Sequence, residues 1–158
     1  MPYNEFVNFK DAIKTCLKNK YANFSGRASR SEFWFFYLFN IIVYAILLLL
    51  IVTVSFKFLW VFGIFVFGII IPALAVTFRR LHDINKSGWL VFLPFPFEII
   101  GRVPERSSGD MMFFSLVFTF IALGLYIYLF VLYIKDGDKK NNRFGKNIYK
   151  KKRKRKRK

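Results

Sequence analysis

The side chains best suited to chemistry lie together in one stretch, TFRRLHDINKSGW, at residues 77–89. It contains His82, the only histidine of the chain, which is followed by Asp83 and preceded by Arg79 and Arg80. A histidine and a carboxylate at a membrane face could exchange protons while two arginines hold an anionic substrate. However, neighbouring residues on a helix point about 100° apart, and no nucleophile motif accompanies the pair. Acid–base chemistry is therefore one hypothesis, and the sequence names no reaction.

The same stretch also fits a polar connection between two membrane helices. If a helix continues through it, Arg79 and Asp83 stand at positions i and i+4 and can form an ion pair. Basic side chains there complement the negative C-terminal end of the helix, and a serine can cap the next helix. The residues with these structural roles are Arg79, Arg80, His82, Asp83, Ser87, Gly88 and Trp89. In a third interpretation, the arginines bind an anionic headgroup or a small ligand without catalysis.

A second polar motif, FSGRASRSEFW, precedes the first apolar run. Ser29 and Glu32 have the spacing of a capping box, which predicts that a helix begins there. Gly26 supplies a turn before the helix. Arg27 and Arg30 would then lie at the level of the lipid headgroups, where they can meet phosphate or pair with a carboxylate of either motif.

Composition indicates that these motifs belong to a membrane protein. Of the 158 residues, 55% are hydrophobic and 22 are phenylalanine, and the net charge is +17. Uncharged apolar runs beside basic segments are typical of integral membrane proteins. With one cysteine, Cys16, and one histidine, neither an intrachain disulfide nor a structural zinc site is expected, and no other metal or cofactor is indicated. The first 30 residues lack the pattern of a cleaved signal peptide.

The hydrophobic pattern predicts an all-α membrane bundle with four transmembrane segments, at about residues 33–56, 58–78, 87–103 and 111–134. The first two and the last contain uncharged runs of 24, 21 and 24 residues. Such runs are long enough to cross a hydrocarbon core of about 30 Å. Lys57 is the only charge between the first two segments, so it marks the place where the chain reverses.

The third segment is the ambiguous one. Its apolar part, Trp89–Ile100, reaches only ~18 Å as a helix, and two prolines interrupt its backbone hydrogen bonding. It could be re-entrant, interfacial or a short, bent crossing. If it crosses, residues 1–32, 79–88 and 135–158, with six, three and fourteen Lys or Arg, lie on one side. The positive-inside rule makes that side the cytoplasm, so we expect four crossings with both termini cytoplasmic.

The two ends of the chain flank the predicted membrane domain of residues 21–145. Residues 1–20 have the periodicity of an amphipathic helix, which either lies on the membrane surface or packs on the protein. Residues 146–158 form a polybasic tail that we expect to be disordered. The tail would associate with anionic lipid, and binding to nucleic acid or the ribosome is the alternative. The oligomeric state is not indicated.

Two residues within apolar sequence favour a further alternative, a small transporter or channel component. Pro72 would kink the second helix and free the backbone carbonyl of Gly68. Glu98 is the one acidic residue in an apolar segment, and ionisable groups in membranes are often functional. Because Arg102 follows four residues later, a surface ion pair explains Glu98 equally well.

Three stretches resemble a family of bacterial inner-membrane proteins, the domain of unknown function 805. They are YANFSGRASRSEFWFF (residues 21–36), PALAVTFRRLHDINKSGW (72–89) and NNRFG (141–145), in the order that the family has. The likeness extends over about residues 10–145. It implies a helical membrane fold and an inner-membrane location but no activity, because the family has no established biochemical function. In many members the third hydrophobic region is one continuous span, whereas residues 98–110 interrupt it here.

Together these patterns predict an inner-membrane protein without catalytic residues. The three motifs would meet at the cytoplasmic face as an ion-pair network that can bind an anionic lipid headgroup, a ligand or a partner. A transporter or channel component, and a membrane enzyme using His82, are the alternatives. The candidate residues are Gly26, Arg27, Arg30, Glu32, Arg79, Arg80, His82, Asp83, Ser87, Gly88, Trp89, Asn142, Arg143 and Gly145.

Overall fold

The structure is a computed structural model that describes residues 7–102 and 109–149. The elements are α1 (Phe9–Lys14), a π-helical turn η1 (Thr15–Asn19), α2 (Arg30–Thr53), α3 (Phe58–Asp83), a 3-10 turn η2 (Gly88–Phe92), α4 (Phe95–Gly101) and α5 (Gly109–Ile134). All of these elements are helical, and the described residues pair in extended form only at an isolated bridge between Asn142 and Gly145. The predicted all-α membrane fold class is confirmed.

Within the residues that the structure describes, three helices are long and apolar enough to cross a membrane: α2, α3 and the Met111–Ile134 part of α5. The third predicted segment, residues 87–103, is broken into η2 and α4, and α4 has only 7 residues. Proline is tolerated in the first turn of a helix but interrupts hydrogen bonding further along it, so α4 begins at Phe95, with Pro94 directly before it and Pro96 in its first turn. The fourth crossing therefore stays a prediction.

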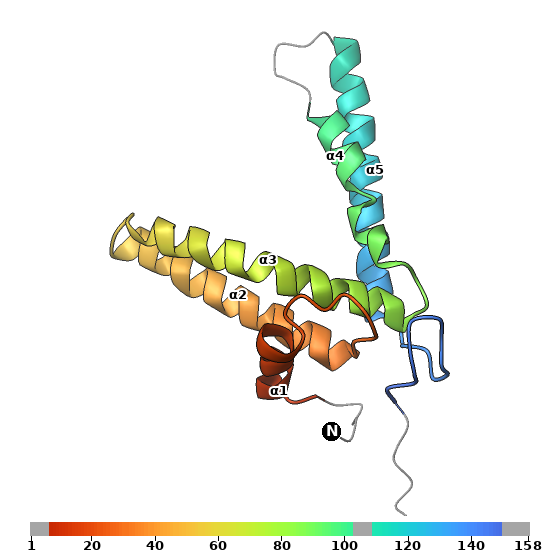
Figure 1. Cartoon of the computed structure of the whole chain (residues 1–158). Helices are drawn as coiled ribbons and strands as arrows, with labels where there is room; N and C mark the ends of the chain where they lie inside the picture. The colour runs from red at the N-terminus through yellow and green to blue at the C-terminus, as the bar shows by residue number, and fades with distance from the viewer. Residues whose placement is uncertain (1–6, 103–108, 150–158) are drawn as a thin grey trace, which may run out of the picture.

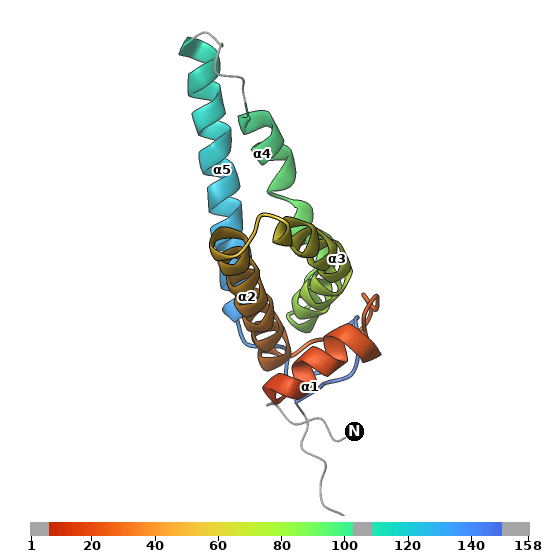
Figure 2. The same ribbon diagram turned by 90° about the vertical axis from the view of Figure 1, so that its left-hand side faces the viewer.

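The helices pair as two hairpins that share one end (Figure 1). α3 returns beside α2, and α5 returns beside α4. From the shared end, which we call the corner, the two hairpins diverge in different directions. Figure 2 shows α1 lying across the base of α2 and α3 at the corner, near the segment that follows α5. The loop before α2, the end of α3 and the segment after α5 thus come together there.

The observed ends of α2 and α3 follow from local interactions. The Ser29 hydroxyl accepts a hydrogen bond from the Glu32 amide at 3.2 Å, so α2 begins at Arg30 rather than at residue 33. Lys57 directly precedes α3, which confirms that the chain reverses there. α3 continues to Asp83, beyond the predicted end at residue 78, so RRLHD is entirely helical.

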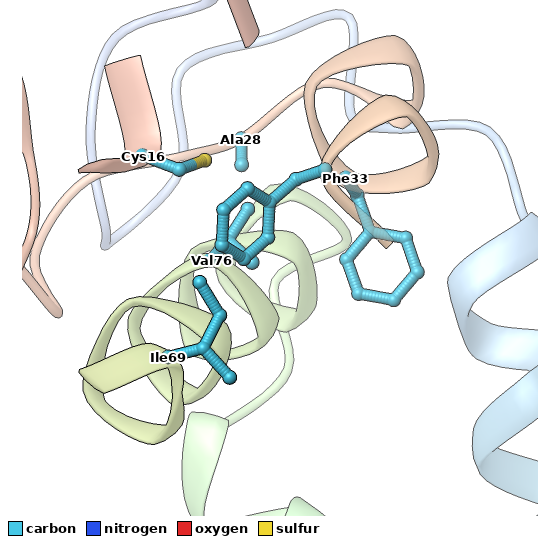
Figure 3. Close-up of a cluster of buried hydrophobic side chains, with 6 residues drawn as sticks. Cys16, Ala28, Phe33, Ile69 and Val76 are labelled. Atoms are coloured by element: carbon cyan, nitrogen blue, oxygen red, sulfur yellow. The ribbon is translucent and has the colours of Figure 1, made fainter. Parts of the chain in front are cut away.

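The main apolar cluster lies between the corner and the middle of α3, while most of the surface of the long helices is exposed. Only 17%, 22% and 17% of the residues in the apolar windows of α2, α3 and α5 are buried. In a membrane, apolar faces gain little by meeting one another, because lipid tails are equally apolar. Packing at the corner therefore contributes most to the specific arrangement. This cluster, of which Figure 3 labels all members except Phe36, consists of Cys16, Ala28, Phe33, Phe36, Ile69 and Val76.

Pro72 lies inside α3 without ending it. Because proline has no amide proton, the carbonyl of Gly68 one turn earlier loses its helical partner. The hydroxyl of Tyr21, at the start of the first motif, donates to this carbonyl at 2.6 Å. The carbonyl that the sequence predicts to be free thus accepts a hydrogen bond from the N-terminal segment.

The N-terminal segment packs on the protein. The Phe9 ring meets Phe35 of α2 edge-on, with centroids 6.0 Å apart, and Cys16 is buried in the core. Basic side chains of α1 and η1 are exposed on the opposite face. Residues 1–6 of the predicted amphipathic helix and residues 150–158 of the predicted tail lie outside the described residues.

Candidate functional site

Asp83 is the centre of a buried group of charged side chains at the corner. One carboxylate oxygen accepts a hydrogen bond from Arg27 Nε at 2.8 Å, and the other accepts one from Arg80 Nη1 at 2.7 Å. The hydroxyl of Tyr149 also donates to the second oxygen. Asp83 and Arg80 are 0% exposed, and Arg27 is 3% exposed. These ion pairs are therefore in the interior of the protein.

Arg79 forms a second buried ion pair at the corner. Its Nη2 lies 2.8 Å from Oε1 of Glu32, and both side chains are almost completely buried. Its Nη1 donates to the backbone carbonyls of Lys20, at 3.2 Å, and Asn23, at 2.8 Å. Arg79 thus connects the end of α3 to the start of α2 and to the segment that follows η1.

The predicted pair between Arg79 and Asp83 is wrong. Successive residues of a helix point about 100° apart, so Arg79 and Arg80 face different neighbours. Arg80, three residues before Asp83, makes the ion pair within α3, while Arg79 faces α2. Two adjacent arginines can therefore bind two different parts of the chain.

Backbone carbonyls in the last turn of α5 and in the segment after it accept further hydrogen bonds from Arg27 and Arg80. Arg27 donates to the carbonyls of Lys140, at 2.8 Å, and Asp138. Arg80 Nε donates to the carbonyl of Tyr133, in the last turn of α5, at 3.1 Å. Carbonyls at the C-terminal end of a helix lack helical partners and carry negative partial charge, so they suit a guanidinium. The end of α5 is thereby tied to α3.

The buried charges do not balance by number, since three arginines face two carboxylates. The carbonyl groups around them and the C-terminal end of α3 supply further negative potential. Removing one partner of a buried pair typically costs about 3–5 kcal/mol, because the other charge is left unpaired. Among the nitrogens of these arginines that the structure describes, only Nε of Arg79 is buried without a partner.

At two positions in and near this group, neighbouring atoms lie so close to the backbone that only glycine fits. A Cβ at Gly137 would overlap the Asp83 carboxylate and the Tyr149 hydroxyl, and a Cβ at Gly88 would overlap the Phe78 ring. Gly88 is a predicted site residue, whereas Gly137 and Tyr149 are not. In the sequence, Gly137 and Tyr149 are a glycine and a tyrosine within a basic, polar segment. Such residues are common in segments of this kind, so the sequence does not single them out.

The NNRFG motif lies against the end of α3. The side-chain amide of Asn142 donates to the carbonyl of His82 at 2.9 Å, and the backbones of Asn142 and Gly145 bond to each other. Arg143, by contrast, is exposed and lies over the Phe144 ring, 4.6 Å from its centroid. Asn142 and Gly145 therefore hold the loop in place, while Arg143 stands outside the buried group.

His82 does not pair with Asp83. Its Nδ1 donates to the carbonyl of Gly26 over 3.2 Å, and its ring stacks on Phe144 with centroids 3.8 Å apart. The carboxylate of Asp83 is engaged by arginines and Tyr149 instead. Gly26 has φ +84°, which supplies the predicted turn. His82 thus connects residues of all three motifs.

The other predicted site residues lie at the surface or beside it. Arg30 pairs with Asp136 at 2.5 Å, and the two side chains are 47% and 72% exposed. Ser87 precedes η2 without a capping hydrogen bond from its side chain, so the predicted cap is wrong. The helix there is only a 3-10 turn. Trp89, the first aromatic residue of that turn, is 72% exposed.

The alternative site at Glu98 lies on the α4–α5 hairpin. Glu98 accepts hydrogen bonds from Arg102 at 2.5 Å and from the Tyr126 hydroxyl at 2.7 Å. The Arg102 side chain is 76% exposed, so the predicted surface ion pair is confirmed. Glu98 thus has one partner directly after α4 and one on α5, and a transport role for it stays a prediction.

The corner also contains side chains of the types that can act as a nucleophile or bind a metal ion. Burial raises the pKa of the Cys16 thiol to about 12, with Glu32 acting in the same direction, so the thiol stays protonated at neutral pH. Burial and the bond to Asp83 also raise the pKa of the Tyr149 hydroxyl. Within residues 7–102 and 109–149, no group of three His, Cys, Asp or Glu side chains could hold a metal ion.

Known proteins share the part of the chain that builds this site. The family described as "Protein of unknown function (DUF805)" matches residues 21–146, which contain all three motifs. Inner membrane protein YhaI of Escherichia coli K12 is 42% identical over 82 residues, covering 50% of this chain and 69% of the relative. Inner membrane protein YhaH of the same strain is 43% identical over 89 residues, covering 50% and 70%. No solved structure matches.

Proposed function

The chain belongs to the DUF805 family, and from this premise we propose that it is a non-enzymatic inner-membrane protein held in shape by an arginine clamp at its cytoplasmic face. The arginine clamp consists of Arg27, Arg79, Arg80, Glu32 and Asp83. Membrane residence follows from the family and from three long apolar helices. The names of YhaI and YhaH support the inner membrane as the location.

The path of the chain supports an even number of crossings. α2 leaves the corner and α3 returns to it, then α4 leads away again and α5 returns. The basic segments that adjoin the corner are residues 10–30, 79–86 and 135–146, so the positive-inside rule favours a cytoplasmic corner. Both termini would then be cytoplasmic and the protein multi-pass. The family motifs would all lie on that side.

The observation that best supports a structural clamp is the burial of its arginines. The side chains of Arg27, Arg79 and Arg80 are 1%, 0% and 0% exposed. Their guanidinium groups bind carboxylates and carbonyls of the chain itself, so they present no free surface to a ligand. We therefore assign the clamp to holding the hairpins and the N-terminal segment together, and not to gripping an anionic substrate.

Anionic headgroups would instead meet the basic residues around the clamp. These residues are exposed and adjoin the corner in sequence: Lys10, Lys14, Lys18, Arg30, Lys86, Lys135, Lys139, Lys140, Arg143 and Lys146. Each basic residue near an anionic surface contributes on the order of 1 kcal/mol of attraction before screening. The polybasic tail would extend the same attraction.

Cysteine accessibility in intact spheroplasts tests this topology. In a C16S background, single cysteines replace Lys57, between α2 and α3, Lys86, after α3, and Lys140, after α5. A membrane-impermeant maleimide should label only the cysteine at position 57, and the other two only after permeabilisation. Labelling of positions 86 and 140 from opposite sides would show an odd number of crossings between them and would refute the proposed topology.

A further inference from the structure

The corner carries a pocket that the arginine clamp does not use. Its volume is about 580 Å³, which lies within the range of roughly 300–1,000 Å³ typical of small-molecule sites. The pocket lies beside the last turns of α3, between the loop before α2, η2 and the NNRFG loop. Its lining is mainly aromatic: Phe24, Phe78, His82, Trp89, Phe92 and Phe144.

Contacts among the lining residues hold the pocket open. The Phe78 ring packs edge-on against Phe24 and Trp89, with centroids 5.2 and 5.6 Å apart. His82 is fixed on the other side by its stacking on Phe144 and by its hydrogen bond to the first motif. These contacts preorganise an apolar surface, which lowers the entropy lost when a ligand binds. They also give the lone histidine a role as a wall of the pocket.

The charge around the pocket decides which class of ligand fits. Aromatic cages often bind cations, but the described residues of this lining include no carboxylate, and the chain has a net charge of +17. Lys86 and Arg143 are exposed and adjoin the lining residues Ser87 and Phe144 in sequence. A cation would be repelled, whereas an apolar chain with an anionic head would satisfy both the lining and the basic residues beside it.

We propose that this pocket binds an anionic phospholipid of the bilayer, with an acyl chain among the aromatic rings and the phosphate beside Lys86 and Arg143. The pocket lies at the end of a helix long enough to cross the membrane, which is the depth at which a headgroup meets its chains. Trp89 belongs at the same depth, because tryptophan prefers the membrane interface. This placement rests on the proposed membrane topology.

Quenching of Trp89 by brominated lipid tests the site directly. The full chain with W34F and W60F keeps Trp89 as its only tryptophan and is placed in nanodiscs of phosphatidylcholine. Phosphatidylglycerol with brominated chains should quench Trp89 at about one-fifth or less of the mole fraction that brominated phosphatidylcholine requires, because one basic residue contributes on the order of 1 kcal/mol and the proposal places two beside the phosphate. Equal quenching by the two lipids, or none by either, would overturn the lipid site.

A matched control uses Trp60, which is 80% exposed near the other end of α3. With W34F, W89F and K57Q, Trp60 should be quenched equally by both lipids, because K57Q removes the exposed basic residue one helical turn away. If neither lipid quenches Trp60, the far end of α3 lies outside the bilayer and the proposed topology fails. That result differs from a failure of the lipid site, in which only the preference at Trp89 is missing.

Two further variants separate the pocket from the charge beside it. L74F places a larger side chain in the lining and keeps every charge, so it should weaken the preference for phosphatidylglycerol by narrowing the pocket. K86Q with R143Q keeps the pocket and should remove the preference by removing the charge. If L74F leaves the preference unchanged, the lipid is held by surface charge alone, and the pocket is not its site. Competition by inorganic phosphate would instead indicate a soluble anion and would also contradict the proposal.

Discussion

Arg27 and Arg30 are three residues apart in the same motif, yet they lie in different environments. Arg27 is buried in the arginine clamp, where Asp83 and backbone carbonyls surround its guanidinium. Arg30 is on the outer rim, where its side chain and that of Asp136 are 47% and 72% exposed. The ion-pair distances are similarly short, so they do not distinguish the two arginines. The two ion pairs differ in their exposure to water.

This difference predicts very different contributions to stability. In the clamp, loss of one partner leaves a charge that water cannot reach, so the full cost of burial appears. At the rim, water and salt replace a lost partner, and exposed pairs contribute about 0–1 kcal/mol. The clamp should therefore determine whether the hairpins stay assembled, while the rim should mainly affect attraction to lipid.

The largest effect is expected for D83A. It leaves Arg27 and Arg80 buried without their carboxylate and should lower the free energy of unfolding by about 3–5 kcal/mol. Thermal unfolding of the purified protein in nanodiscs, followed by the reactivity of the Cys16 thiol, measures the loss. The control is E98Q, which alters an exposed ion pair on α4 and should leave the unfolding temperature nearly unchanged.

Y149F should have the next largest effect. It removes the hydroxyl that donates to Asp83, and hydrogen bonds to charged groups typically contribute about 1.5–3 kcal/mol. The same unfolding assay measures the change, and Y128F on α5 is a control outside the clamp. If Y149F unfolds at the same temperature as the parent protein, the segment after α5 does not close the clamp as described.

G137A should cost somewhat less, about 1–3 kcal/mol, because a Cβ there would overlap Asp83 and Tyr149 and the backbone must shift. G124A is the matched control, since a Cβ at Gly124 of α5 would meet nothing within 4 Å. It should be neutral or slightly stabilising, because alanine favours helix. Equal destabilisation by the two variants would indicate that the close approach at Gly137 is not real.

R30A should have the smallest effect, at most about 1 kcal/mol, and added salt should reduce it further. Unfolding at low and high ionic strength gives this comparison. A loss as large as that of D83A, unchanged by salt, would mean that rim and clamp do not differ as the structure indicates.

Much of the fold could be predicted from the sequence, because a long uncharged run can lie in the hydrocarbon core of a membrane and the charged residues between runs must lie outside it. The runs around α2, α3 and α5 were predicted, as were the reversal at Lys57 and the start of α2 near Ser29. The third segment was harder, because its prolines permit several backbone paths. The structure resolves it into a 3-10 turn and a short helix that begins at Phe95, directly after Pro94.

The site was predicted less completely. Motif likeness pointed to Arg27, Arg79, Arg80 and Asp83, but helical spacing assigned the wrong partner to Arg79. A pair at i and i+4 is only locally favourable, whereas a buried arginine is positioned by all the acceptors around it. Glu32 supplies that partner from α2, 47 residues away in the chain. Contacts made through tertiary packing leave no periodic signal in the sequence, which is also why Tyr149 was missed.

A double-mutant cycle between Arg27 and Asp83 tests the clamp most directly. R27Q, D83N and the double variant are compared with the parent protein by unfolding in nanodiscs. If the two side chains form one buried unit, the double variant should be more stable than the sum of the single losses indicates, by about 1–3 kcal/mol. Losses that add within about 0.5 kcal/mol would show that Arg27 and Asp83 act independently, and would contradict a clamp built from the first two motifs.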